Sequence, residues 1–158
     1  MKQILKKGCN NDSGFTLLEV LVALAILSVG LLGVAAMSMT TVRGNASSDR
    51  MTIATNLAQS RIDTVLALPF NTGIQVDTNV NNNPANGGNL QNTVVFDYSE
   101  RVDAQDNVGT GIYTRIWNIA DNEPSANMKT VAVIVQWTEV LNGANTTRQV
   151  TLSTLISG

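Results

Sequence analysis

The stretch Gly14-Phe15-Thr16-Leu17-Leu18-Glu19 opens a predominantly apolar run that continues to Met39. Residues 20–39 carry no charged side chain, and a run of this length can cross a bilayer as a helix. No proline precedes Pro69, so nothing in the sequence forces this helix to stop at the end of the apolar run. A carboxylate at the head of such a run is unfavourable in an apolar environment unless it has a partner. Glu19 is therefore a candidate functional residue.

A short basic segment precedes this run. It contains three lysines and only one acid, Asp12. This excess of positive charge favours an N-terminus held in the cytoplasm and export of everything after about residue 40. A secretory signal is cleaved after its apolar region, at small residues. Here the small residue that suits processing, Gly14, lies before that region. Ser28-Val29-Gly30 and Ala35-Ala36-Met37-Ser38 keep ordinary signal cleavage open as an alternative.

This arrangement of basic leader, glycine, aromatic residue, threonine, two aliphatic residues and glutamate resembles the processing motif of type IV pilins and pseudopilins. The resemblance implies that a prepilin peptidase cuts between Gly14 and Phe15 and methylates the new amino group of Phe15. Residues 1–14 would then form the leader peptide. The mature chain would begin at Phe15 and keep its membrane helix.

The same resemblance implies a partner for Glu19. In assembled filaments of this family, the glutamate of one subunit lies against the N-terminal amine of a neighbour. Two opposite charges about 4 Å apart gain about 4 kcal/mol at an effective dielectric constant of 20, so the contact is physically reasonable. Two alternatives remain open: a side chain that reaches the lipid headgroups, or one that caps the first turn of its own helix.

The helix is expected to continue beyond the membrane. Residues 15–40 are predicted as the transmembrane or filament-core helix, and residues 41–69 as its amphipathic continuation, because apolar residues recur there every three or four positions. Pro69 disfavours helical geometry at the residue before it and marks the end. Gly30 and Gly33 weaken the membrane half, and the resemblance implies that the helix can unwind there in an assembled fibre. The alternative is that the helix tolerates these two glycines without unwinding.

The rest of the chain is predicted as a loop followed by a sheet. Residues 70–92 are rich in asparagine and glycine and have too few apolar residues to pack tightly. Residues 93–158 alternate apolar and polar side chains in four segments, at 93–98, 112–119, 128–139 and 148–156. The last three predict an antiparallel meander whose apolar face, including Trp117 and Trp137, is covered by the amphipathic half of the helix. The predicted fold is α+β and pilin-like, with a long N-terminal helix packed on a C-terminal antiparallel β-sheet.

Composition argues against several functions. The chain has no histidine, and its one cysteine, Cys9, lies in the predicted leader, so zinc sites and cysteine or serine triads lack their usual members. Cys9 precedes the apolar region, which disfavours lipidation. Without the leader the net charge is −4, which disfavours nucleic acid as a partner. We therefore expect neither an enzyme nor a cofactor.

The densest acidic cluster is expected to be a solvated loop, with a weak calcium site as the alternative. Its members are Asp97, Glu100, Asp103 and Asp106.

The C-terminal part refines the resemblance. Trp117-x-Ile119, Asp121-Asn122-x-Pro124 and the alternating segment from Lys129 to Trp137 are similar to the PilV-like type IV pilus modification proteins, a group of minor pilins. This implies a precursor that crosses the inner membrane once and has its C-terminal domain in the periplasm. The processed protein would later reach the pilus. Its partners would be prepilin peptidase, other major and minor pilins, the inner-membrane assembly machinery and, before assembly, membrane lipid. A minor pseudopilin of a type II secretion system is the close alternative, and a membrane-tethered periplasmic enzyme or binding domain the distant one.

Overall fold

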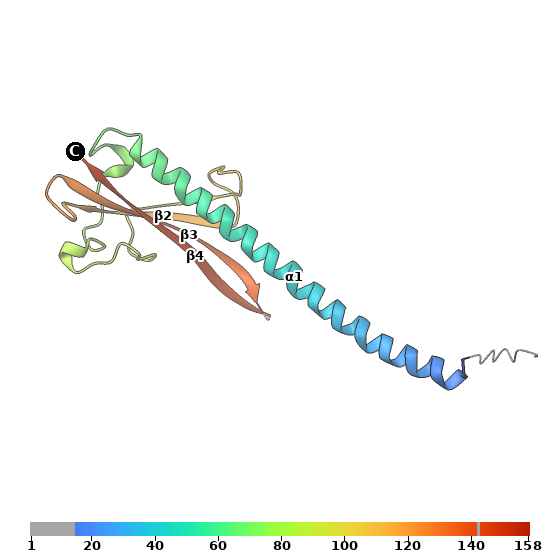
Figure 1. Cartoon of the computed structure of the whole chain (residues 1–158). Helices are drawn as coiled ribbons and strands as arrows, with labels where there is room; N and C mark the ends of the chain where they lie inside the picture. Colours follow the sequence, from blue (N-terminus) through green and yellow to red (C-terminus); the bar gives the residue numbers. More distant parts are fainter. Residues whose placement is uncertain (1–14, 142) are drawn as a thin grey trace, which may run out of the picture. The chain divides into compact units, whose positions relative to one another are not determined.

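The computed structural model describes residues 15–141 and 143–158, so the predicted leader lies outside it. One helix, α1 (Leu17–Leu66), precedes a four-stranded sheet (Figure 1). The strands are β1 (Tyr98–Val102), β2 (Tyr113–Asp121), β3 (Met128–Leu141) and β4 (Ala144–Ser157), and two short 3-10 turns, η1 (Gly73–Gln75) and η2 (Pro84–Asn86), lie in the connection. The strand order is β1-β2-β3-β4, and every neighbouring pair is antiparallel. The predicted α+β class is confirmed.

The chain divides into two compact units, one ending at Asn45 and the other running from Ala46 to Gly158. The second unit is the globular domain, and its helical part is the C-terminal portion of α1. That portion buries Ala54, Leu57, Ala58, Ile62 and Val65. The predicted amphipathic face is confirmed, and the helix ends at Leu66, three residues before the predicted boundary at 69.

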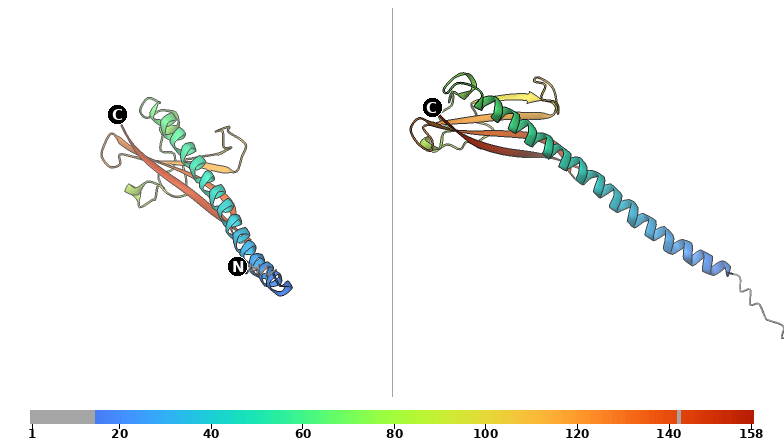
Figure 2. Two further views of the ribbon diagram at one scale, coloured as in Figure 1. Left: turned by 45° about the vertical axis from the view of Figure 1, so that its right-hand side comes forward. Right: turned by 45° about the horizontal axis from the view of Figure 1, so that its top comes forward.

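The core lies between this helical portion and one face of the sheet. Both views of Figure 2 show the strands side by side next to the C-terminal part of α1. Alternate residues of β2 and β3 point toward the helix, as the sequence pattern predicted, and together with the helix they form the main apolar cluster. The sheet residues buried in that cluster include Tyr113, Trp117, Ile119, Val131, Val133, Val135 and Trp137.

The tryptophans pack against aromatic rings of neighbouring strands. Trp117 on β2 stacks on Tyr98 of β1, with ring centroids 5.2 Å apart and planes within 10°. Trp137 on β3 packs at a tilt against Tyr113 of β2, at 6.0 Å. These offset and tilted aromatic pairs stabilise the strand order beyond simple burial.

The predicted strand at 93–98 is wrong, because the edge strand β1 begins at Tyr98. Side chains, rather than a neighbouring strand, bind the backbone of residues 93–97. The Asn92 side chain accepts hydrogen bonds from the amides of Val94 and Val95, at 2.9 and 3.0 Å. This local asparagine turn satisfies the amides that a sheet ladder would have used.

The connection between α1 and the sheet is better packed than the sequence predicted. Gln75 and Asn82 are fully buried. Asn118 of β2, also fully buried, donates from its side chain to the carbonyls of Leu90 and Asn92, at 2.7 and 2.9 Å. Leu90 packs with Ala120 and Ala132, which belong to the sheet face opposite the helix. The loop therefore forms a second layer, held by amide hydrogen bonds instead of by apolar bulk.

Candidate functional site

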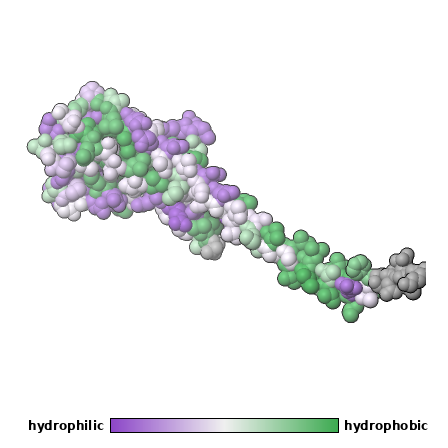
Figure 3. All heavy atoms as spheres, in the orientation of Figure 1, coloured by the Kyte–Doolittle hydropathy of each residue, from purple (hydrophilic) through white to green (hydrophobic). Residues whose placement is uncertain are grey.

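The first unit presents an exposed apolar helix. In the described part of the chain, α1 is the one helix long and apolar enough to cross a membrane, and its most apolar window has a mean hydropathy of 2.7. None of that window is buried by the rest of the protein. Figure 3 shows the corresponding hydrophobic surface on the N-terminal part of the helix, next to the residues drawn in grey. An uncovered apolar surface of this extent marks a site of membrane or protein interaction.

Four hydroxyl side chains within this apolar helix are satisfied by the helix itself. The hydroxyl of Ser28 donates to the carbonyl of Leu24 at 2.7 Å. Ser38, Thr40 and Thr41 donate in the same way to the carbonyl four residues earlier, at 3.0–3.2 Å. A hydroxyl bonded to its own helix carries a smaller penalty in apolar surroundings. The helix can therefore enter lipid or a protein core without leaving these groups unpaired.

Thr16 caps the start of α1. Its hydroxyl accepts a hydrogen bond from the Glu19 amide at 3.3 Å, and its carbonyl accepts from the Val20 amide at 3.2 Å. Threonine followed three positions later by glutamate is the signature of a capping box, so the sequence did contain the signal for this role. Sequence reasoning treated Thr16 only as part of the processing motif and missed it.

Glu19 lies in the first turn of α1, where the partial positive charge of the helix N-terminus favours a carboxylate. Within residues 15–141 and 143–158, the structure shows no hydrogen bond or ion pair to its side-chain oxygens. Thr16, not Glu19, supplies the side-chain cap that the structure records. The Glu19 carboxylate is thus available to a partner outside the described chain.

The other predicted site residues are placed as follows. Phe15 is 84% exposed and lies just before the helix begins. Gly14 lies outside the described residues. Gly30 and Gly33 are helical, and a methyl group added at either would meet nothing within 4 Å in the described chain. No neighbour in this chain therefore requires glycine at these positions, and unwinding there stays a prediction.

The predicted solvated acidic loop is wrong for three of its four members. Asp97 accepts from the Asn79 and Ile119 amides, each at 2.7 Å. Asp103 shapes an exposed turn, and hydrogen bonds from Asn107 lower the pKa of its carboxyl. The other two acids, Glu100 and Asp106, form ion pairs. Among the residues that the structure describes, no three metal-ligating side chains come close enough to hold an ion.

Glu100 and Asp106 meet a buried arginine that sequence reasoning did not assign a role. Arg115 of β2 is 2% exposed, and its guanidinium pairs with Glu100 at 2.7 Å and with Asp106 at 2.8 Å. It also donates to the carbonyl of Leu57 in α1, at 3.0 Å. Arg61 of α1 pairs with Glu100 as well and stacks on Trp117. This arginine–carboxylate network joins helix and sheet in the middle of the domain.

A second ion network lies near the start of the globular unit. Glu139 of β3 is 5% exposed and accepts from Arg148 of β4 at 3.0 Å. Arg50 of α1 lies 3.9 Å from the same carboxylate, and the Ser47 hydroxyl donates to it at 3.4 Å. Glu139 thus ties the β3–β4 hairpin to the first turns of the globular helical segment.

Comparison with known protein families supports the reading of the N-terminus. Residues 9–35 match the model of the prokaryotic N-terminal methylation motif. The chain carries a type IV prepilin-like N-terminus. Comparison with curated proteins and with solved structures gave no match.

The methylation motif indicates a substrate of prepilin peptidase, of the pilin-like or pseudopilin kind. Proteins with this motif are structural rather than catalytic, and the apolar part of α1 fits membrane anchoring of a pilin-type protein. The match covers residues 9–35, and the globular unit lies outside it.

Proposed function

We propose that this protein is a minor type IV pilin that enters the pilus, or its tip, through the apolar part of α1. Prepilin peptidase removes residues 1–14 and methylates Phe15, residues 15–40 form the membrane and filament-core segment, and residues 41–158 carry the rest of the helix, the loop and the sheet on the periplasmic side. The observation that carries the proposal is an exposed apolar helix whose first turn holds an unpaired carboxylate and lies within a methylation motif.

In this proposal Glu19 neutralises the amine on Phe15 of a neighbouring subunit. Thr16 already supplies a cap for α1, so the carboxylate is not needed for that purpose. Leaving a membrane carboxylate unpaired is unfavourable, whereas pairing it with an amine in a dry helix bundle is favourable. The contact therefore favours lateral packing of subunits in one axial register.

The similarity of the C-terminal segments to PilV-like proteins favours a minor pilin over a pseudopilin. Partner identity separates the two. If the protein co-purifies with pilus fibres, the proposal is supported. If it co-purifies with the type II secretion machinery instead, the protein is a pseudopilin and the proposal is wrong.

The decisive experiment replaces Glu19 by glutamine in the native host and compares the amount of protein in sheared fibres with the amount in the membrane. We expect normal insertion and cleavage, and a loss of incorporation of about tenfold, which corresponds to about 1.4 kcal/mol of lost pairing. The control is Asp49→Asn, because Asp49 is an exposed acid farther along the same helix. Unchanged incorporation of Glu19→Gln would show that the carboxylate has no assembly role.

A companion variant tests processing separately. Gly14→Ala should slow or block leader removal, which mass spectrometry of the purified protein measures directly. A mature N-terminus at Phe15 in unaltered amount would contradict the predicted cleavage site.

A further inference from the structure

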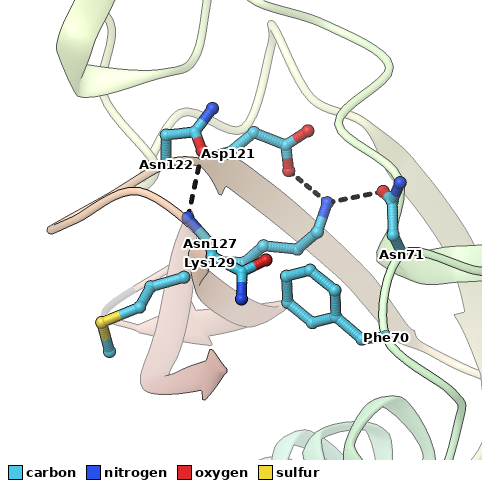
Figure 4. Close-up of a pocket in the computed structure, with 7 residues that line it drawn as sticks. Phe70, Asn71, Asp121, Asn122, Asn127 and Lys129 are labelled. Carbon is cyan, nitrogen blue, oxygen red and sulfur yellow. Dashed lines mark hydrogen bonds and ion pairs between the residues drawn. The ribbon is translucent and has the colours of Figure 1, made fainter. Parts of the chain in front are cut away.

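A polar cavity lies at the end of the globular unit where α1, β2 and β3 give way to turns. Its volume is about 220 Å³. Phe70 and Asn71 follow the end of α1, Asp121 ends β2 and Asn122 follows it, and Asn127 and Lys129 lie where β3 begins (Figure 4). The end of α1 and the β2–β3 connection, which are far apart in sequence, therefore build one site, on the part of the domain that is remote in sequence from the membrane anchor.

The charges in this cavity cancel. The Lys129 side chain is 3% exposed, forms an ion pair with Asp121 across the β2–β3 ladder, and donates to the Asn71 side-chain oxygen at 3.0 Å. Its amine also lies 5.5 Å from the centre of the Phe70 ring. Figure 4 shows the amine between Asp121 and Asn71, with the Phe70 ring beside it. With its one cation already paired, the cavity offers no net charge to a ligand.

Three polar atoms at the cavity keep free hydrogen-bonding capacity. The Asn71 side-chain oxygen is occupied by Lys129, which leaves the Asn71 Nδ2 group as a donor. The Asn122 oxygen accepts from the Asn127 amide at 3.3 Å, which leaves Asn122 Nδ2 as a second donor. Asp121 uses Oδ1 for Lys129, so Oδ2 is a free acceptor. None of the three has a partner within residues 15–141 and 143–158.

The backbone holds these groups in place before any ligand arrives. Asn71, Asn122 and Asn127 have φ angles of 61°, 59° and 64°, in the left-handed region that asparagine adopts more readily than most residues. The hydrogen bonds from Lys129 to Asn71 and from the Asn127 backbone amide to Asn122 orient the two side chains, which lowers the conformational entropy lost on binding.

We propose that this cavity binds a neutral saccharide, one sugar ring at a time. A sugar hydroxyl both donates and accepts, and here a carboxylate acceptor lies in the same cavity as two amide donors. The paired Lys129 gives no free charge for an anion, and the paired Asp121 offers only half of its carboxylate to a cation. Phe70 supplies an apolar wall for the C–H groups of a ring. The inference is independent of the filament role, because it concerns the globular unit and needs no contact made by Glu19.

The test uses the full chain, labelled with ¹⁵N, in micelles of lauryldimethylamine oxide. Maltoside detergents are avoided because their headgroups are themselves saccharides. Methyl glycosides of glucose, galactose and mannose are titrated as neutral probes, with glucuronate as the charged probe and glycerol as a control for non-specific hydroxyl effects. We expect saturable shifts of the Asn71, Asn122 and Lys129 signals with at least one methyl glycoside, at a millimolar dissociation constant.

Two variants assign the binding to the cavity. Asn122→Gly removes the amide but tolerates the positive φ angle, and should weaken binding about threefold to tenfold, the value of one neutral hydrogen bond. Asn71→Asp keeps an oxygen for Lys129 but removes the donor and the neutrality, and should weaken binding at least as much. Asn56→Gly, on the exposed face of α1, should leave the dissociation constant unchanged.

Three results would overturn the proposal. These are the absence of saturable shifts with every methyl glycoside, equal binding by Asn122→Gly and Asn71→Asp while their spectra remain native, or tighter binding of glucuronate than of the methyl glucoside. The native spectra of both variants separate a lost ligand contact from a lost fold.

Discussion

Replacing Arg115 by methionine should remove the principal polar contact between α1 and the sheet. Its guanidinium forms ion pairs with two carboxylates, Glu100 and Asp106, and donates to one helix carbonyl, that of Leu57. Methionine fills much of the same volume but donates no hydrogen bond. Glu100, at 15% side-chain exposure, would then depend on Arg61 alone, and the Leu57 carbonyl would be left without its donor.

The expected loss follows from this burial. Removing one partner of a buried ion pair costs about 3–5 kcal/mol. Unfolding a domain the size of residues 46–158 has an entropy of about 2.1 cal/mol/K per residue, so each kcal/mol lowers Tm by about 4 °C. Arg115→Met should therefore lower Tm by about 13–21 °C, a large part of the stability of an ordinary domain.

Tryptophan fluorescence during urea unfolding is a direct assay. Trp117 and Trp137 are the two tryptophans of the sequence, and both are buried in the globular unit, so the signal reports that unit and not the anchor. The control is Arg101→Met on the neighbouring strand, where an exposed arginine donates to the Gly111 carbonyl; it should cost no more than about 1 kcal/mol.

Arg115→Lys gives a graded check. It should fall between the native protein and Arg115→Met, because lysine keeps the charge without the planar fork that reaches two carboxylates. A loss below about 1 kcal/mol for Arg115→Met, with an unchanged urea slope, would refute the view that this network holds helix to sheet.

Two further predictions concern the loop and the edge strand. Asn118→Ala should lower the free energy of unfolding by about 2–3 kcal/mol, because two loop carbonyls lose their donor. The same variant should be cut faster within residues 76–97 in limited proteolysis. A cleavage pattern identical to that of the native protein would contradict this prediction. Burial, reinforced by Asp97 and Asp77, raises the pKa of Tyr98 above its ordinary value of 10.0, so the native state holds the phenolic proton more tightly than the unfolded chain. The resulting stability is fully present below about pH 10 and is lost as the pH rises through the raised pKa; urea unfolding at about pH 9 and about pH 11 should show this fall, smaller in Tyr98→Phe.

The parts of the fold that depend on apolar periodicity were predictable from the sequence. The helix and the last three strands all bury one regular face, and the alternation of residues 131–137 placed Val131 and Trp137 on the correct side of the sheet. The processing motif was equally readable, because its residues are contiguous and its context, a basic leader before an apolar run, is local.

The features that the sequence did not reveal depend on polar groups that leave no periodic trace. Asparagine-rich composition predicted a loose loop, yet Asn82 and Asn118 are buried, because Asn82 donates to the Asn118 side-chain oxygen and Asn118 donates to the Leu90 carbonyl. The Asn92 side chain accepts from the Val94 backbone amide, which is therefore not free to pair in the strand predicted at 93–98. Arg115 did stand on the apolar, helix-facing side of its strand, and a cation in that position requires a buried carboxylate partner. That reasoning points to the acidic cluster at 97–106, which contains both carboxylates that Arg115 contacts.

The continuity of α1 has a mechanical consequence. Any tension between a fixed N-terminal anchor and the globular unit enters that unit through the helix backbone at Asn45 and Ala46. The first cross-links to take up the load are those from Ser47 and Arg50 to Glu139, before the apolar face of α1 and the deeper Arg115 contacts. In a chain pulled by its N-terminal end, the contacts to Glu139 would therefore carry load before the contacts of the core.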